Sequence, residues 1–474
     1  MNLTSLLPLA LTLLCIVPGH IANPAPHYPA LSPLVARSPG GALPAAPYSV
    51  GFSRKVPRRK EKINALSALC GHGGSGHGAK PGSQTTVPLA GSNFDSDYLV
   101  NVTIGGQNFS LILDSGSADT WVPQQGFQCF NLTGSPVPPA TCNFGTTGFN
   151  VNESKTFEPF PNVSFNITYG TSEFVAGPVG FDTVSVGGLE VSQQVVPLPN
   201  VAAWLGDGIL SGIIGLAFPD ETSLFNTTEP TTATKQNHIP YDPLFFTAVK
   251  QKKVKHPFFS IALNRPTPDQ EEHDAYDPNL GILAFGGIAD VPVLHNTSTT
   301  VAVQEFTSNA TKADEKFFWY TIPIDSYNFP GSKNVPEARN ASLGNGTTIL
   351  DTGTAVNRIP GPVAAAYAAA FDPPAELTSI AGLSLYLAQC NATVPPFSVT
   401  IGGQAFSMDP RDQLLPVVTD EQGDVVCVLG TQAQQGAPDL SKDFHLLGDT
   451  FFHNVVTTFN PIDKEVTLTQ RVAY

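Results

Sequence analysis

The sequence predicts an all-β protein built from two lobes of similar topology. Short runs of alternating apolar and polar residues recur along residues 86–474, the pattern of half-buried strands. Proline accounts for 43 of the 474 residues, about twice its usual share of ~5%, which disfavours long helices. A strand-like segment ending in Asp-hydroxyl-Gly-hydroxyl occurs twice, at 111–117 and 348–354. Such an internal repeat indicates two related lobes.

Charge is distributed unevenly along the chain. The net charge is −15 at pH 7, which argues against nucleic acid as a partner, because phosphate contacts need clustered Lys and Arg. Residues 1–80 contain eight Lys and Arg and a single acid, Glu61, whereas residues 81–474 contain 16 basic and 38 acidic side chains. A basic head with a net charge of +7 therefore precedes an acidic body with a net charge of −22.

The head carries targeting and processing signals rather than a domain. Residues 3–18 form a short apolar run followed by Gly19 and Ala22, which predicts a secretory signal peptide over 1–22. A membrane anchor is the alternative, but the run is shorter than the ~20 residues that span a bilayer. Residues 23–85 are rich in Pro, Ala and basic side chains, typical of a prosegment and linker. We expect secretion, with the vacuole as an alternative destination, and a mature form outside the membrane.

The body is expected to divide into an N-terminal lobe at 86–295 and a C-terminal lobe at 296–474. Strand candidates lie at 98–104, 109–114, 165–169, 182–188, 258–263, 281–287, 347–350, 397–403, 425–430 and 465–470. Helix candidates are few, at 243–254 and 362–371. Each begins with a proline, which suits a first helical turn. The body is therefore mostly β with small helices.

Four of the six cysteines lie in the body. Cys15 belongs to the signal peptide and Cys70 to the head. Nearest-neighbour pairing gives the disulfides Cys129–Cys142 and Cys390–Cys427, although the sequence alone allows three connectivities. The spacing does not resemble a zinc site. Twelve Asn-x-Ser/Thr sequons in the body predict a glycoprotein.

The repeated motif carries an acid–base chemistry. Each aspartate, Asp114 and Asp351, follows an apolar strand, and an apolar-apolar-Gly segment follows downstream, at 213–215 and 446–448. The intervals from aspartate to glycine are 101 and 97 residues. Two carboxyl groups about 3 Å apart cannot both ionise, so they share a proton. Such a pair can take a proton from a bound water and donate one to a carbonyl oxygen.

The residues that follow each aspartate are expected to support the pair. Glycine permits close approach of the two loops. The first hydroxyl of each motif can bond across the axis, and the second can orient the carboxylate. These residues are Ser115, Gly116, Ser117, Thr352, Gly353 and Thr354.

These motifs resemble those of the pepsin-like aspartic endopeptidases, and most of all the secreted fungal, polyporopepsin-type members. The resemblance covers essentially all of 86–474. It implies a bilobal all-β fold with an active-site cleft between the lobes. It also implies that Asp114 in DSGSADTW and Asp351 in DTGT are the catalytic residues. The proton shared by the aspartate pair is an established property of that family.

The resemblance also identifies a flap and a set of substrate-binding residues. The segment 165–184 resembles the flap hairpin of the family. Flap or substrate-binding roles are implied for Tyr169, Gly170, Thr171, Trp121, Ile112 and Ile213. Phe318 is a further apolar pocket candidate. Without the aspartate pair, an ordinary half-buried strand position would be the better interpretation of Tyr169.

Three positions depart from the family pattern. Ser115 stands where Thr is usual, which predicts a slightly looser clamp with activity retained. Asp119 stands where a neutral polar residue is common, and close to the pair it would raise the pKa values. Ser211 replaces an aspartate. Other acids near glycines are expected to cap turns or loops rather than to catalyse, namely Asp182, Asp207 and Asp449.

The expected function is that of a secreted aspartic endopeptidase. It would hydrolyse extended polypeptides, preferring hydrophobic residues at the cleavage site, by activating water between Asp114 and Asp351 at acid pH. The alternative is a catalytically weak binding or inhibitor protein on the same fold. We expect no cofactor and no metal, a monomer, and a basic prosegment that inhibits the cleft through Lys55, Lys60 or Lys62. No HExxH or GxSxG motif supports another mechanism.

Overall fold

A computed structural model gives the fold of this chain. It describes residues 85–92, 97–170, 173–266, 277–305, 317–330, 347–380, 383–419, 425–434 and 445–474. The predicted signal peptide and nearly all of the predicted prosegment, including Lys55, Lys60 and Lys62, lie outside the described residues, as does Thr171.

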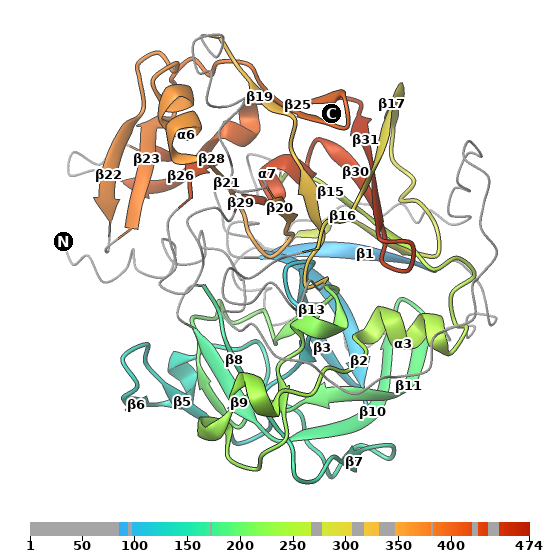
Figure 1. The fold of residues 1–474 in the computed structure, drawn as a ribbon. Coiled ribbons are helices and arrows are strands. Elements are labelled where there is room, and N and C mark those ends of the chain that lie inside the picture. The colour runs from blue at the N-terminus through green and yellow to red at the C-terminus, as the bar shows by residue number, and fades with distance from the viewer. Residues whose placement is uncertain are drawn as a thin grey trace.

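The described chain is mostly β, as predicted, and it forms two lobes (Figure 1). Among the described residues, thirteen strands join in one sheet that runs through both lobes. Its strands are β1 (Thr85–Ser92), β2 (Asp97–Ile104), β3 (Gln107–Asp114), β4 (Thr120–Trp121), β7 (Glu158–Pro159), β10 (Val179–Val186), β11 (Leu189–Pro197), β13 (Ile213–Gly215), β15 (Phe259–Leu263), β16 (Asp277–Phe285), β17 (Val293–Ala302), β30 (Val455–Asn460) and β31 (Glu465–Arg471).

The remaining strands form sheets within single lobes. In the N-terminal lobe they are β5 (Gln128–Phe130), β6 (Pro136–Val137), β8 (Ser164–Thr168), β9 (Phe174–Gly177), β12 (Val201–Ala203) and β14 (Leu224–Phe225). In the C-terminal lobe they are β18 (Thr321–Pro323), β19 (Ser326–Asn328), β20 (Thr347–Leu350), β21 (Asn357–Ile359), β22 (Glu376–Ile380), β23 (Leu383–Gln389), β24 (Phe397–Ile401), β25 (Gln404–Met408), β26 (Leu414–Thr419), β27 (Val425–Leu429), β28 (Thr431–Ala433) and β29 (His445–Leu447).

The α-helices are short. They are α3 (Leu244–Lys250), α6 (Gly361–Ala368) and α7 (Asp449–Phe452). The first two match the two predicted helices, and a proline stands at the N-cap of each. Buried Leu244, Phe245 and Ala248 fasten α3 to the core, because three apolar side chains on one face of a short helix must be covered by its neighbours.

The internal repeat predicted from sequence is present in the strand pairing. In the first copy β13 runs parallel to β3, which places Gly215 opposite Asp114. In the second copy β29 runs parallel to β20, which places Leu447 opposite Leu350. In each copy a third strand then pairs antiparallel with this parallel neighbour, β4 with β13 and β21 with β29. Each aspartate therefore ends or follows a central strand that a parallel neighbour supports.

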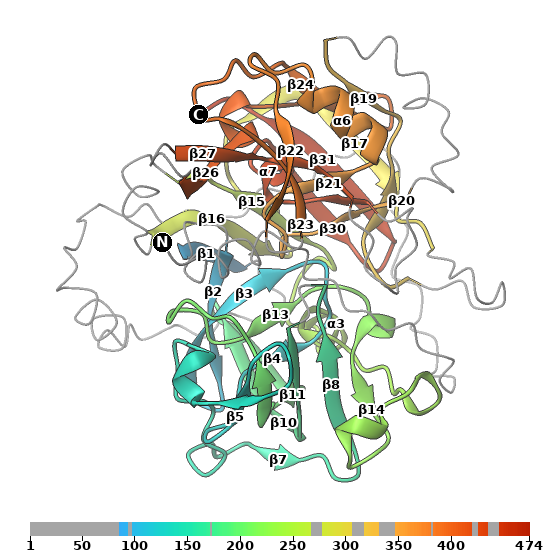
Figure 2. The same cartoon turned by 90° about the vertical axis from the view of Figure 1, so that its left-hand side faces the viewer.

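The two lobes share their central strands. β15 pairs with both β16 and β30, and β16 pairs in turn with β1. Figures 1 and 2 show β1 and β16 between the blue-to-green lobe and the orange-to-red lobe. The lobe boundary expected at 295/296 falls inside β17. Local strand patterns do not reveal this sharing, since it arises from pairing between segments far apart in the sequence.

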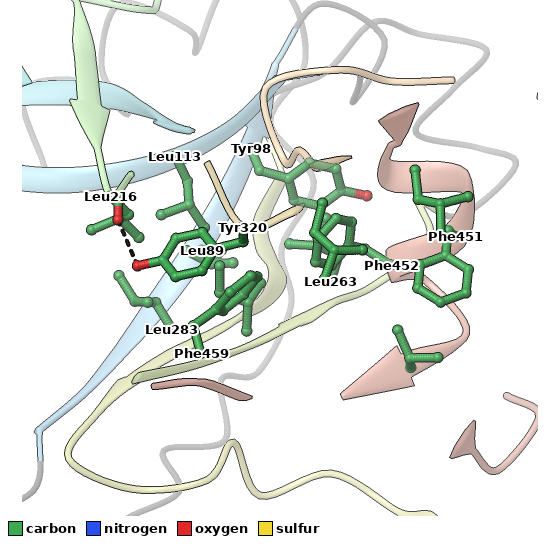
Figure 3. Close-up of a cluster of buried hydrophobic side chains, with 14 of the residues drawn as sticks. Leu89, Tyr98, Leu113, Leu216, Leu263, Leu283, Tyr320, Phe451, Phe452 and Phe459 are labelled. Carbon is green, nitrogen blue, oxygen red and sulfur yellow. Dashed lines mark hydrogen bonds between the residues drawn. The ribbon is translucent and has the colours of Figure 1, made fainter. Parts of the chain in front are cut away.

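A single hydrophobic cluster also joins the lobes. Leu113 and Leu216 of the first lobe and Phe451 and Phe459 of the second lobe are fully buried in it. Tyr320 lies among them, and its hydroxyl donates to the carbonyl oxygen of Leu216 at 2.9 Å (Figure 3). Burial of such side chains contributes roughly 1.5–3 kcal/mol each. The lobes are therefore held together next to the strands that carry the aspartates.

Both nearest-neighbour cysteine pairs are disulfide-bonded, Cys129 with Cys142 and Cys390 with Cys427. Each bridge closes a loop within one lobe. Among the described residues, no helix is long and apolar enough to cross a membrane.

Candidate active site

The two repeated motifs meet at the contact between the lobes. Asp114 is the last residue of β3, and Asp351 directly follows β20. Their proximity is visible in the glycines that follow them. A β-carbon placed on Gly116 would lie 2.4 Å from Asp351 Oδ1, and one placed on Gly353 would lie 2.6 Å from Asp114 Oδ1. Only glycine fits at these two positions, because any side chain would collide with the opposite carboxylate.

Each aspartate is oriented by two donors from its own loop, a glycine amide and a hydroxyl group, and the two loops match in this respect. The amide of Gly116 donates to Asp114 Oδ1 at 2.7 Å, and the Ser117 hydroxyl donates to Oδ2. Around the other aspartate, the amide of Gly353 donates to Asp351 Oδ1 at 2.9 Å. The Thr354 hydroxyl donates to its Oδ2 at 2.6 Å. The repeat in sequence is therefore a repeat in hydrogen bonding.

The remaining hydroxyls of the motifs clamp the two loops together. Thr352 N donates to Ser115 Oγ at 3.0 Å, and Ser115 N donates to Thr352 Oγ1 at 3.1 Å. Each hydroxyl also donates across the axis to a strand carbonyl, Ser115 to Leu350 O and Thr352 to Leu113 O, both at 2.8 Å. Serine at position 115 makes both kinds of contact without the methyl group of threonine.

The electrostatics of the pair favour a retained proton. Both side chains have no exposed surface. Burial raises the pKa of Asp114 well above its ordinary value, and the nearby charge of Asp351 raises it further. Burial likewise raises the pKa of Asp351, against the hydrogen bonds from Thr354 and Gly353. The arrangement can hold one proton between two carboxyl groups at a pH where an isolated aspartate is ionised.

The predicted flap is a hairpin that closes over Trp121. Its strands are β8 and β9, and Tyr169 N donates to Glu173 O at 2.8 Å at its tip. Trp121 Nε1 donates to the Tyr169 hydroxyl at 2.7 Å. Gly170 is exposed at the end of the hairpin. The hydrogen bond ties the flap to the strand that follows the first aspartate loop.

The apolar candidates lie in two buried clusters. Ile112 and Ile213 pair in register and pack with Trp121 and Tyr169. Phe318 packs in another cluster with Ala118, Ala217, Trp319, Ile349 and Leu446. The first cluster places Ile112 and Ile213 behind the flap and beside the first aspartate loop.

Asp119 is buried but is held by groups other than the aspartate pair. Its carboxylate accepts from Ser223 N at 3.1 Å and from the Tyr241 hydroxyl at 2.6 Å. Burial raises its pKa to about 6. The expected effect of Asp119 on the pair is not found, because the pKa of Asp114 is raised by burial and by Asp351, and the pKa of Asp351 is raised by burial.

Of the three acids that were expected to cap turns or loops, two accept hydrogen bonds and one does not. Asp207 caps a turn, since it accepts from the amides of Ile209 and Leu210 at 2.8 and 2.9 Å. Asp182 has a structural role, accepting from Ser154, Thr156 and Thr183.

The expectation of a capping role for Asp449 is wrong. Its side chain is 3% exposed and neither carboxylate oxygen has a hydrogen-bond partner. Burial raises its pKa well above the ordinary value, and Asp351 adds to the shift.

Three residues near the pair were not anticipated from sequence. Trp204 packs edge-on against Trp121 and Tyr169, at ring-centroid distances of 5.2 and 5.7 Å. Tyr241 holds Asp119. Glu221 is a buried carboxyl group without a hydrogen-bond partner. No motif surrounds these residues, although an acid two residues after a proline in an otherwise apolar segment could have drawn attention to Glu221.

Among the residues that the structure describes, no group of three or more His, Cys, Asp or Glu side chains is placed to hold a metal ion. The paired carboxyl groups can bind a water molecule and exchange protons with it.

Comparison with known proteins agrees with this geometry. The family model described as "Eukaryotic aspartyl protease" matches residues 97–471. A probable aspartic-type endopeptidase of Aspergillus fumigatus is 31% identical over 364 residues, which cover 77% of this chain and 76% of that protein. Rhizopuspepsin-4 of Rhizopus niveus is 27% identical and covers 80% of this chain and 78% of its own. The crystal structure of an aspartic proteinase from Irpex lacteus superposes with a TM-score of 0.58 at 20% identity, covering 82% of this chain and 98% of that one.

Proposed function

The chain belongs to the eukaryotic aspartyl protease family and is an aspartic-type endopeptidase with the pepsin-like fold, and we propose that Asp114 and Asp351 are its catalytic residues. The observation that carries this proposal is the mutual contact of the two loops, in which each glycine lies against the opposite carboxylate. Matched hydrogen bonds on both aspartates support the same assignment.

In the proposed reaction, a water molecule binds between the two carboxyl groups. The ionised member of the pair accepts a proton from this water, whose oxygen attacks the scissile carbonyl carbon. The protonated member donates its proton to the carbonyl oxygen, which gives a tetrahedral diol. The newly protonated carboxyl group then donates its proton to the leaving nitrogen, while the ionised carboxylate takes a proton from one hydroxyl of the diol. The carbon–nitrogen bond breaks, the carboxylic acid and the amine are released, and one proton remains on the pair. The glycine amides and the hydroxyls of Ser117 and Thr354 keep each carboxylate in position during these transfers.

Tyr169 and Trp121 are proposed to close the site. Their hydrogen bond holds the hairpin over the aspartate loops, and a closed hairpin excludes water and positions an extended peptide. The proposed preference for hydrophobic side chains at the cleavage site rests on Ile112 and Ile213, which pack with Trp121 and Tyr169. Gly170 and Thr171 are proposed to contact the peptide from the flap.

We further propose that the enzyme works at acid pH. Burial raises the pKa values of Asp114, Asp119, Glu221 and Asp449. The folded protein therefore favours protonated carboxyl groups at and around the pair. As pH rises, loss of the shared proton removes the general acid and should stop catalysis.

Secretion, glycosylation and activation from a precursor are part of the proposal. Sequon asparagines within the described residues lie mostly at the surface. Those at 101, 108, 131, 152, 162, 226, 296 and 391 are exposed, whereas Asn166 is half-buried. The basic head and acidic body favour an inhibitory prosegment that acid releases. Two motifs in one chain favour a monomer.

The test is cleavage of casein or haemoglobin by the processed protein across a range of pH, with and without pepstatin. We expect activity that is confined to acid pH and abolished by pepstatin. N-terminal sequencing and mass spectrometry of the secreted form give the mature start and the occupied sequons. A folded, processed protein that cleaves neither substrate at any acid pH would favour the alternative, a binding or inhibitor protein on this fold.

A further inference from the structure

His453 is a buried, ionisable side chain that the proposed reaction does not use. It is 8% exposed and directly follows α7. Its two ring nitrogens meet groups from different lobes. Nδ1 lies 3.0 Å from Asp412 Oδ1 in the second lobe, and Nε2 lies 2.5 Å from the hydroxyl oxygen of Tyr98 in the first lobe. The ring therefore bridges the two lobes.

The proton on Nδ1 is fixed by the Asp412 carboxylate. Besides His453, this carboxylate accepts from two nitrogens of Arg265 at 2.6 and 2.7 Å and from Asn454 Nδ2 at 2.7 Å. Burial opposes its ionisation, but His453 and Arg265 lower its pKa to about 2. An ionised carboxylate can accept hydrogen bonds but cannot donate one. Nδ1 of His453 must therefore carry a proton and donate it to Asp412.

The hydrogen bonds on the other side of the ring require a second proton. The Tyr98 hydroxyl lies within reach of two groups, His453 Nε2 and the carbonyl oxygen of Asn264, the latter at 2.8 Å. A carbonyl oxygen can only accept, and so can Nε2 when the ring is neutral, whereas a hydroxyl has one proton to give. If Nε2 is protonated, it donates to Tyr98 while Tyr98 donates to Asn264. Only the doubly protonated ring completes all three hydrogen bonds.

The bridge is attached at one end to the loop of the second aspartate. Asp449 N and Thr450 N, in the first turn of α7, donate to Thr354 O at 2.8 Å and to Ala355 O at 3.1 Å. These two carbonyls lie directly after the Asp351 motif. The short helix therefore connects the second aspartate loop to the histidine that follows it.

The other end of the bridge is attached beside the first aspartate. Tyr98 is fully buried and lies on β2, which pairs along its length with β3, the strand that ends in Asp114. Tyr98 shares one buried cluster with Phe452, the residue before His453 (Figure 3). A change in the bridge would therefore act on the backbone that sets the separation of the two catalytic carboxyl groups.

The surroundings of the ring place its second protonation in the acid range. Burial lowers the pKa of His453, and the positive charges of Arg265 and Arg471 lower it further, while Asp412 opposes them. The ring therefore takes up its second proton below the ordinary histidine value of about 6.5. The ionisable groups packed around His453 are Asp412, Arg265, Arg471, Tyr98 and Tyr474.

We propose that His453 is a positioning residue for the reaction, and that its doubly protonated ring ties the loop of Asp351 to the strand beside Asp114. When the ring loses its second proton, the Tyr98 hydroxyl can satisfy only one of its two acceptors, and the tie between the lobes is weakened. This inference rests on the proposed peptidase function. It adds to that function an acid-dependent group that is separate from the aspartate pair.

The first test is an NMR titration, which needs no substrate. The processed protein is labelled with ¹⁵N-histidine, and the signals of His453 are identified by their loss in His453→Gln. In Tyr98→Phe the charged ring loses the acceptor of its Nε2 proton. The affinity of the ring for that proton should then fall about 10–100-fold, as expected for one hydrogen bond to a charged group, which lowers the pKa by about one to two units. If the neutral ring instead accepts from Tyr98, the same variant would raise the pKa. A raised or unchanged pKa overturns the inference.

The second test compares kcat/KM on one peptide across the acid range. His453→Gln is neutral at every pH, so it should lose about tenfold where the wild-type ring is charged. Its ratio to wild type should approach one as pH rises above the measured pKa of His453. His295→Gln, which removes an exposed histidine, should match wild type throughout. A loss in His453→Gln that is the same at every pH would show a purely structural role and overturn the inference. Failure of the wild-type enzyme to cleave any peptide would count against the proposed function, while the NMR titration would still decide the protonation of His453.

Discussion

Ser115 and Thr352, which are 237 positions apart in the chain, each accept a hydrogen bond from the backbone amide of the other. Each hydroxyl then donates to a strand carbonyl of the opposite lobe, at Leu350 and Leu113. The four bonds are fully buried and surround the point where Asp114 and Asp351 meet. Because these bonds hold the two backbone loops together, they fix the distance between the two carboxyl groups without involving the aspartate side chains.

Replacing Ser115 by alanine should loosen this clamp. The change leaves the amide of Thr352 and the carbonyl of Leu350 without partners, at a cost of about 1–3 kcal/mol for each buried group. We expect a lower free energy of unfolding in urea and a lower kcat/KM on a peptide substrate. Ser115→Thr, which copies Thr352, serves as the control and should retain both. Wild-type stability in Ser115→Ala would contradict this account of the clamp.

Replacing Tyr169 by phenylalanine should weaken catalysis more than folding. Trp121 Nε1 would lose its acceptor, and the flap would lose its tie to the aspartate loop. A hydrogen bond contributes about 1 kcal/mol on average, which corresponds to a loss of roughly fivefold in kcat/KM. Tyr367→Phe is the matched control, because the Tyr367 hydroxyl donates to Pro395 O in the core of the other lobe. If both variants lose activity equally, the bond between Tyr169 and Trp121 has no special role.

Asp119 should make the folded protein less stable as pH rises. Burial raises its pKa from 3.8 to about 6, so the folded state binds its proton more tightly than the unfolded state does. This contribution to stability is fully present below the unfolded pKa and is lost as pH rises through the folded value. A shift of about two pKa units corresponds to roughly 3 kcal/mol. We expect Asp119→Asn to flatten the decline in unfolding free energy between about pH 4 and pH 7. An unchanged slope in the variant would show that other groups cause it.

Asp412 should stabilise the fold in the opposite pH range. It is 2% exposed and accepts from Arg265 at 2.6 and 2.7 Å and from His453 at 3.0 Å. Burial opposes its ionisation, but His453 and Arg265 outweigh burial and lower its pKa to about 2. Because the folded pKa is depressed, its contribution is present above the unfolded pKa near 4 and is lost as pH falls through about 2.

Asp412→Ala should therefore lower the unfolding free energy by about 3–5 kcal/mol at mildly acid pH, since it leaves Arg265 buried without a carboxylate. Lys250→Ala removes an ion pair with Asp242 at the surface. This variant should change the unfolding free energy by less than about 1 kcal/mol. Urea unfolding of both variants distinguishes the two cases. A small effect of Asp412→Ala would mean that Arg265 finds another partner or reaches water.

The fold and the aspartate pair could be predicted because their signals are local. Each aspartate is preceded by an apolar strand and followed by a loop that contains glycine. The motif occurs twice, with nearly equal intervals from the aspartate to the downstream glycine, and this repeat indicated two related lobes. Asp449 shows the limit of this reasoning. It follows the second apolar-apolar-Gly segment, so a capping role was expected, yet its carboxylate lies buried and unpaired near Asp351.

Other features depend on contacts between distant segments and leave no local pattern. The sheet that joins the lobes pairs β15 with β30, strands that are nearly 200 residues apart. Asp119 is held by Tyr241, which is 122 positions away. Glu221 sits in a segment tied both to the aspartate loop and to the flap strand. Sequence reasoning named the residues of the repeat and of the flap, but it did not name Trp204, Tyr241 or Glu221, because no local motif marks them.

The most direct measurement is kcat/KM on a single peptide at acid pH for Asp114→Asn and Asp351→Asn. Circular dichroism and thermal unfolding should first establish that each variant is folded. Asparagine keeps the shape of the side chain but cannot share or transfer the proton. If the two carboxyl groups act as a pair, both variants should lose at least about 10²–10⁴-fold in rate, the usual contribution of general acid–base catalysis. Wild-type activity in either folded variant would contradict the assignment.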